Sequence, residues 1–473
     1  MIVQKVAIMT FGDPREHEWK SFISKYAIPR HKQAIDFFKK KSLEVIHLET
    51  LPRSNAEIDE QVDYFKSKGA EVFIAHTSTW SWPSMVVRAV QRMGLPTILL
   101  GNDHPGTAST VGLLGGGGAL SQVGYPHIRV LSEFDDSEDS VFEKKVLPYI
   151  RAASAAIKLK GKVMGFYGGR SLGIDTGSND PMQWKRQFGV DTDHVDQLEI
   201  IRLSELIDDD RVEKMEKWLT GKVKEVKYDE KLTVDKLKFQ IRCYLATKDI
   251  IKEKGHHFVA IKCMPDLSNH YVPQCLSAAF LPSPFDADGP KEPTSMACEA
   301  DADGALTMEI LKLVTGGTPP MFGDASNIDP KNSLMYIPNC GAISAWYATR
   351  KNDADENLSN IDLRAANRPA GGAIPFMKVA AGDITLARLY RKSGKYYMAI
   401  IPGEVITPEH ELYENYKRSR GEHQLPTAFV KADIDFDKFI EEFGSNHISA
   451  VAGNCTKELQ YICEMLEVEP VLM

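Results

Sequence analysis

The sequence predicts an α/β protein with two doubly wound Rossmann-like α/β domains, residues 1–155 and 156–317, followed by a β-rich, small-barrel C-terminal domain, residues 318–473. In the first two regions, short apolar runs alternate with amphipathic helical patterns, which is typical of parallel sheets covered by helices. After Gly317, short apolar runs are separated instead by Gly, Pro, Asn and Asp, which favours antiparallel strands. A chain of 473 residues is also too long for one ordinary core.

The first region predicts five strands and the helices between them. Its apolar runs are residues 5–11, 43–48, 71–76, 96–100 and 128–131, and the clearest amphipathic stretches are 55–68 and 83–93. The acidic residues 135–139 are expected to open the last helix of this region, because a helix N-terminus favours negative charge.

The second and third regions continue the two patterns. Residues 152–162 predict a helical link. The second region is expected to form strands at 163–167 and 257–262 and helices at 209–219, 234–254 and 303–314. The third region predicts strands at 334–337, 377–379, 384–390 and 396–400, then a strand at 448–451, a helix at 456–466 and a last strand at 469–472.

Composition excludes several classes of function. The net charge of −8 argues against nucleic-acid and anionic-membrane partners, which need clustered Lys and Arg. No segment approaches the roughly 20 apolar residues that a bilayer span needs. The seven cysteines form no CxxC pair, which argues against a disulfide framework and a thiolate zinc site. With no signal-peptide pattern at the N-terminus, we expect a cytoplasmic protein.

The clearest chemical signal is a run of acids at alternate positions, Glu299, Asp301 and Asp303, leading into an amphipathic helix. A carboxylate there can bind a hard cation, and the helix N-terminus favours its ionised form. The acids could instead only cap the helix, which is the interpretation we adopt for Asp303 and favour for Asp301. Glu299 lies further upstream, where a solvated cap is less expected, and is the better candidate ligand.

Two further residues can complete a site. Asp324 follows apolar Met321-Phe322 and is interpreted as the end of a strand, a common position for catalytic groups, although a turn residue is the usual alternative. His447 begins an apolar strand, where a structural histidine is the usual alternative. Two carboxylates and one imidazole would suit Mn²⁺, Mg²⁺, Fe²⁺ or Co²⁺.

A collinear set of motifs resembles the L-fucose/L-arabinose isomerase superfamily. The motifs run through nearly the whole chain and include residues 105–106 with 121–126, 160–162 with 168–174, the stretch around Glu299, and the Gly-Ser-Asn-His segment that ends at His447. The resemblance implies that Glu299, Asp324 and His447 bind Mn²⁺, with Mg²⁺, Co²⁺ or Fe²⁺ as alternatives.

The resemblance is nearer to the fucose branch. Arabinose isomerases carry another His on the strand after the second acid, whereas residues 337–341 here are Ile-Pro-Asn-Cys-Gly. Asn339 and Asn446 are candidate substrate contacts, although Asn446 could instead orient the loop of His447. Arg15 resembles a family arginine that reaches substrate in a neighbouring subunit, with a turn and a solvated arginine as the alternative. Trp80 follows the third expected strand and could stack on a sugar. Not all of the sugar-gripping residues of the family align, which leaves specificity open.

The function that this resemblance implies is metal-dependent aldose–ketose isomerisation of a free, L-fucose- or D-arabinose-like aldose through an ene-diolate. Glu299 and Asp324 would then act as acid and base as well as metal ligands. The resemblance also implies a homotrimer or homohexamer in which the N-terminal domain of a neighbour completes the site. The alternatives are an isomerase of a different or modified sugar and a non-catalytic sugar-binding or regulatory protein.

Overall fold

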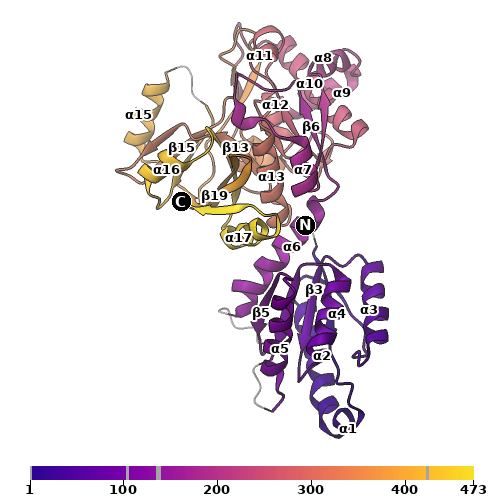
Figure 1. Cartoon of the computed structure of the whole chain (residues 1–473). Coiled ribbons are helices and arrows are strands. Elements are labelled where there is room, and N and C mark those ends of the chain that lie inside the picture. The colour runs from indigo at the N-terminus through magenta and orange to yellow at the C-terminus, as the bar shows by residue number, and fades with distance from the viewer. Residues whose placement is uncertain (1–2, 103–105, 135–139, 422–424) are drawn as a thin grey trace. The chain divides into compact units, whose positions relative to one another are not determined.

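The computed structural model describes residues 3–102, 106–134, 140–421 and 425–473. The chain folds as two compact units, Met1–Ile157 and Lys158–Met473 (Figure 1). The predicted fold class is confirmed, since parallel sheets with helices precede a β-rich C-terminal region. The predicted division of residues 156–473 into two domains at 317 stays a prediction. The acidic stretch at 135–139 lies outside the described residues.

The first unit is built on a five-stranded parallel sheet. The strand order is β2 (Glu44–Ile46), β1 (Lys5–Thr10), β3 (Val72–Thr77), β4 (Thr97–Gly101) and β5 (His127–Leu131). Its helices are α1 (Glu16–Glu18), α2 (Ser24–Lys39), α3 (Asn55–Ser67), α4 (Pro83–Met93), α5 (Ser109–Gln122) and α6 (Leu147–Leu159), with π-helical turns at Trp19–Ile23 and Phe142–Val146.

Both faces of this sheet are buried, as a parallel sheet requires. Ala7 and Met9 of β1 belong to one core cluster with α3, α4 and α5, while Val6 and Ile8, on the opposite face, are equally buried. Helix α4 has the bounds that the sequence predicts, because Pro83 occupies its first turn and Gly94 ends it in the left-handed conformation.

The second unit begins with a four-stranded parallel sheet. Its strand order is β12 (Met296–Cys298), β9 (Phe258–Ile261), β6 (Val163–Tyr167) and β7 (Asp191–Val195). Its helices are α7 (Pro181–Gln187), α8 (Leu198–Ser204), α9 (Asp209–Lys222), α10 (Val234–Lys254), α11 (Asp266–His270), α12 (Cys275–Phe280) and α13 (Ala302–Val314), with a 3₁₀ turn at Asp175–Gly177.

An eight-stranded sheet follows in the same unit. Its strands are β13 (Pro320–Asp324), β21 (His447–Ala452), β18 (Gly382–Lys392), β19 (Lys395–Val405), β20 (Thr427–Lys431), β15 (Leu334–Pro338) and β14 (Asn327–Asp329) in spatial order, with β22 (Glu469–Leu472) parallel to β19. The other pairings in this sheet are antiparallel. The long β18–β19 hairpin turns at Ser393-Gly394, both at positive φ, as a two-residue hairpin loop favours.

Helix α13 lies between these two sheets. It contacts β9 and β12 of the parallel sheet and β13, β18 and β21 of the antiparallel sheet, and all of its residues are buried. The loop that enters α13 from β12 is therefore held next to β13 and β21.

Smaller elements complete the second unit. They are β10 (Phe285–Asp286) with β11 (Gly289–Pro290), a three-stranded sheet of β17 (Ala373–Phe376), β16 (Asp362–Ala365) and β8 (Glu225–Val226), helices α14 (Ala354–Leu358), α15 (His410–Arg420), α16 (Phe436–Glu442) and α17 (Thr456–Met465), and a 3₁₀ turn at Ala345–Ala348. No helix of the described residues is long and apolar enough to cross a membrane.

The strand predicted at 377–379 is wrong, because the strand is β17, immediately upstream. Strand β17 contains Pro375, which cannot donate to a ladder. Strand β17 tolerates it because it is an edge strand that pairs only with β16.

Candidate active site

Glu299 is placed by an unusual backbone at the end of β12. Glu299 and Ala300 have φ of 56° and 51°, a left-handed conformation that non-glycine residues rarely adopt. The Ala300 amide donates to the Ile261 carbonyl at the end of β9, which fixes the turn. Glu299 is only 7% exposed. Such backbone strain is concentrated at functional sites, where the surrounding structure maintains it.

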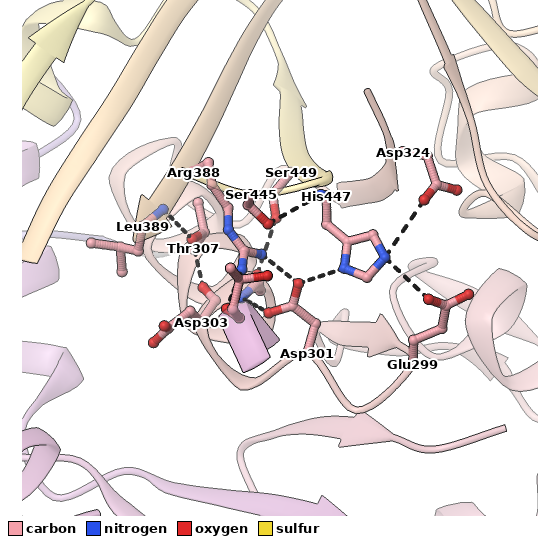
Figure 2. Close-up of polar contacts among 12 residues, drawn as sticks. Glu299, Asp301, Asp303, Thr307, Asp324, Arg388, Leu389, Ser445, His447 and Ser449 are labelled. Atoms are coloured by element: carbon pink, nitrogen blue, oxygen red, sulfur yellow. Dashed lines mark hydrogen bonds and ion pairs between the residues drawn. The ribbon is translucent and has the colours of Figure 1, made fainter. Parts of the chain in front are cut away.

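Asp324 and His447 are placed by strand pairing. They are directly opposite each other at the ends of the antiparallel strands β13 and β21, so their side chains lie on the same face of the sheet. His447 Nε2 lies 3.2 Å from Glu299 Oε2 and 3.5 Å from Asp324 Oδ1. Figure 2 shows both carboxylates turned towards this one nitrogen. Three residues from separate parts of the chain thus converge.

The other side of the His447 ring faces Asp301. His447 Nδ1 lies 2.7 Å from Asp301 Oδ2, and because a carboxylate can only accept, Nδ1 donates (Figure 2). Asp301 also accepts from Arg388 through Oδ2 and from the Gly304 amide through Oδ1. Asp301 therefore orients the imidazole as well as capping α13, an arrangement typical of metal-binding histidines.

The electrostatics of the cluster follow from burial and close charges. Burial lowers the pKa of His447, but hydrogen bonds to Asp301 and Glu299 outweigh it and raise the pKa to about 9. Burial raises the pKa of Asp324 to about 6, and the nearby charge of Glu299 adds to this. Burial opposes ionisation of Asp301, yet Arg388 and His447 hold its pKa well below the ordinary range.

The donor set fits a divalent cation. With Nδ1 committed to Asp301, Nε2 is the nitrogen free for a metal, and two carboxylates accompany it, a set that suits Mn²⁺ or a similar ion. In the described part of the chain no group of three His, Cys, Asp and Glu side chains is already spaced around an ion. The three donors contact one another directly, so a bound ion requires Nε2 to be unprotonated and the carboxylates to turn towards the ion.

Two predicted substrate residues lie beside this cluster. The Asn339 side chain is buried, donates to the Ala342 carbonyl and Cys298 Sγ, and accepts from the Cys340 amide. It therefore holds its own loop against the residue before Glu299. Asn446 is exposed, and its carbonyl accepts from the Ala325 amide. A substrate role for either residue stays a prediction.

Arg15 and Trp80 belong to the first unit, whereas Glu299, Asp324 and His447 belong to the second. Arg15 forms an ion pair with buried Asp13, at 2.6 Å between Nη2 and Oδ2. Trp80 follows β3 and is half-buried. Their role as substrate residues stays a prediction.

The predicted capping role of Asp301 is confirmed, but its contact with His447 and the role of Arg388 were not predicted, and the interpretation of Asp303 as a cap is wrong. Asp303 is not a solvated cap: it is buried, and Tyr396 Oη donates to its Oδ1 at 2.8 Å. Alternate acids before an apolar helix were visible in the sequence, but burial on both sides of α13 was not. Arg388, in an otherwise apolar strand, was a signal for a buried carboxylate partner.

Comparison with known proteins gives matches at both ends of the chain. The first N-terminal domain of L-fucose isomerase matches residues 3–161, and its C-terminal domain matches residues 337–473, together more than half of the chain. A sulfoquinovose isomerase from Priestia aryabhattai is 23% identical over 458 residues, covering 95% of this chain and 96% of that protein. An L-fucose isomerase from Vibrio vulnificus is 22% identical, covering 88% of this chain and 83% of that protein.

Among solved structures, a periplasmic solute-binding protein of an ABC transporter from Actinobacillus succinogenes, with bound D-allose, is 14% identical. It covers 56% of this chain and 80% of its own, with a TM-score of 0.17. A likeness at that TM-score supports no argument.

Proposed function

This chain belongs to the L-fucose isomerase family, and from that premise we propose that it is a metal-dependent aldose–ketose isomerase. The observation that carries the proposal is the convergence of Glu299 and Asp324 on His447 Nε2. Since the full-length relatives are named isomerases, the non-catalytic alternative is set aside.

The proposed reaction moves one proton between C2 and C1 of the sugar and another between O2 and O1. A C–H beside a carbonyl is a poor acid, so the main cost is the negative charge of the ene-diolate. A divalent cation, held by Glu299, Asp324 and His447, supplies Lewis-acid stabilisation of that charge when bound. Mn²⁺ is the proposed ion, with Mg²⁺, Co²⁺ or Fe²⁺ as alternatives.

The protein's own side chains would carry the protons. In the aldose-to-ketose direction, one of Glu299 and Asp324 removes the C2 proton, and the same proton is returned to C1. The other carboxylate takes the O2 proton and protonates O1, so no proton is gained or lost overall. Asp301 keeps the His447 ring oriented throughout. Glu299, Asp301 and His447 are buried, which strengthens their charge interactions, whereas Asp324 is half-buried.

Two substrate classes are proposed. The resemblance of residues 337–341 to the fucose branch favours an L-fucose- or D-arabinose-like aldose. The relatives named sulfoquinovose isomerase favour a modified sugar, and they match almost the full chain. We also propose a homotrimer or homohexamer in which Arg15 and Trp80 of a neighbouring subunit complete the site, and a cytoplasmic location.

The testing experiment measures ketose formation by metal-stripped protein before and after Mn²⁺ is added back. The sugars are L-fucose, D-arabinose and sulfoquinovose. Glu299→Gln is compared with Glu292→Gln, the same change at an exposed glutamate seven positions upstream. We expect turnover only with metal, and a loss of at least about a hundredfold for Glu299→Gln, because it removes a ligand and a proton carrier.

Calorimetric titration with Mn²⁺ separates the parts of the proposal. Tight binding that Glu299→Gln abolishes and Glu292→Gln preserves supports the metal site independently of turnover. Absence of Mn²⁺, Mg²⁺, Co²⁺ and Fe²⁺ binding, or turnover that persists after complete metal removal, refutes the metal-dependent mechanism.

A further inference from the structure

A cavity of about 450 Å³ lies in the second unit beside the cluster of Glu299, Asp324 and His447. Cys340 in its wall follows Asn339, whose side-chain amide donates to Sγ of Cys298, the residue before Glu299. On another wall, Arg420 at the end of α15 donates to Ser326 Oγ at 2.6 Å, two residues after Asp324. Neither carboxylate lines the cavity, but its walls lie close enough that Glu299 acts electrostatically on Cys263 and Arg420 acts on Asp324.

The lining of this cavity is positively charged. It includes two guanidinium groups, Arg368 and Arg420, and contains no Asp or Glu among the described residues. The remaining lining is mostly apolar or uncharged, such as Ala365, Ile374 and Leu425. A volume of this size is within the ordinary range for small-molecule sites.

Neither guanidinium forms an ion pair within the part of the chain that the structure describes, although the charge of Arg420 acts on Asp324. The Arg368 side chain has no hydrogen bond or ion pair to any described residue, and it is half-buried. Arg420 uses one nitrogen for Ser326 and stacks near the Tyr416 ring, without a carboxylate within ion-pair distance in the described chain. Most arginines of this protein that are equally buried have acidic partners, for example Arg211 with Asp249.

The chemistry of these groups indicates what they recognise. Neutral sugar hydroxyls are bound by groups that accept as well as donate, whereas guanidinium only donates. Two guanidinium groups that form no ion pair with a described acid match the oxygens of a sulfonate, phosphate or carboxylate, which they bind through short, charge-assisted hydrogen bonds.

We propose that the cavity is a subsite for a terminal oxyanion of the sugar, bound by Arg368 and Arg420 while C1 and C2 lie at Glu299 and Asp324. The inference rests on the proposed isomerase function and deepens it, since it assigns the substrate class: an aldose with an anionic group at the end distant from C1. It selects the modified sugar over the neutral one.

The test compares three variants of the full-length, Mn²⁺-loaded protein. Arg368→Gln and Arg420→Gln remove the proposed ligands, while Arg418→Gln is the matched control on the same helix, exposed and outside the cavity lining. The substrates are glucose derivatives with a 6-sulfonate, a 6-phosphate or a 6-carboxylate, together with neutral D-glucose and L-fucose. Comparison of the three charged sugars identifies which oxyanion the subsite accepts.

We expect wild-type kcat/KM to be highest for one of the charged sugars. Each arginine variant should lose about ten- to a hundredfold in kcat/KM for that sugar, the loss expected for one or two charge-assisted hydrogen bonds. The loss should appear mainly in KM, and Arg418→Gln should retain wild-type values. Preference for neutral sugars, or equal losses for charged and neutral sugars, overturns the proposal.

A second measurement separates this inference from the proposed function. Calorimetric binding of the non-reacting 6-sulfonate, 6-phosphate and 6-carboxylate alditols requires no turnover. If no aldose is isomerised, the isomerase proposal fails, yet alditol binding that depends on Arg368 and Arg420 still supports the oxyanion subsite. Absence of binding by all three alditols, or binding unaffected by both substitutions, refutes the subsite.

Discussion

Replacement of Asp301 by Asn tests the charge and the orienting hydrogen bond of Asp301 separately from its role as the cap of α13. Asn keeps an oxygen for the Gly304 amide, so the cap of α13 survives. The atom facing Arg388 and His447 becomes an amide that can only donate, opposite two groups that also donate. The change therefore removes the charge and the orienting hydrogen bond while preserving the size of the side chain.

The size of the expected losses in stability and in metal affinity follows from the burial of Asp301 and its partners. The side chains of Arg388 and Asp301 are both 0% exposed, and besides Asp301 the guanidinium donates to the Thr176 carbonyl at 2.8 Å. Leaving such a charge without its partner costs about 3–5 kcal/mol of the free energy of unfolding. Loss of the carboxylate that orients a metal-binding histidine lowers metal affinity by about ten- to a hundredfold.

The assay combines guanidinium unfolding of the metal-stripped protein with calorimetric Mn²⁺ titration. Asp180→Asn is the control, because Asp180 caps α7 in the same unit and has no ion pair among the described residues. The double variant Asp301→Asn/Arg388→Met should recover stability, because the uncompensated charge is gone, but should not recover metal affinity. A single Asp301→Asn variant that matches Asp180→Asn in both measurements would refute the reasoning.

Three further changes test other parts of the fold. Burial lowers the pKa of His76 from 6.5 to about 4. The contribution of His76 to the free energy of unfolding should therefore be complete above pH 6.5 and should fall by up to about 3 kcal/mol towards pH 4. His76→Gln should reduce this fall in unfolding curves measured at several pH values, and an unchanged slope would contradict the prediction. Gly304→Ala would place a Cβ 2.6 Å from Phe322 Cε2, and should cost about 1–3 kcal/mol by overpacking, measured by thermal unfolding, whereas a variant as stable as the parent would mean that α13 shifts freely. Tyr396→Phe removes the hydroxyl that donates to buried Asp303 and should cost about 1–3 kcal/mol in guanidinium unfolding, with no loss expected if water replaces the hydroxyl.

Secondary structure was largely predictable where local signals agree. Helices α4 and α10 have the predicted bounds, because their ends carry strong local signals such as Pro83, Gly94 and Gly255. The strand expected at 377–379 is wrong because the residues that form the strand, Ala373–Phe376, are set by pairing with β16, which the apolar run does not specify.

The sequence by itself determined the α/β class, the β-rich C-terminal region and the three candidate donors Glu299, Asp324 and His447, because periodicity and motif spacing are local properties of the chain. Only the tertiary structure decided that Asp301 and Arg388 support the histidine, and that Arg368 and Arg420 share a cavity beside it. The physical reason is that a side chain's partners depend on strand pairing, on the packing of α13 between two sheets, and on burial. These contacts join residues more than 80 positions apart, as Asp301 and Arg388 are, and no local pattern contains them.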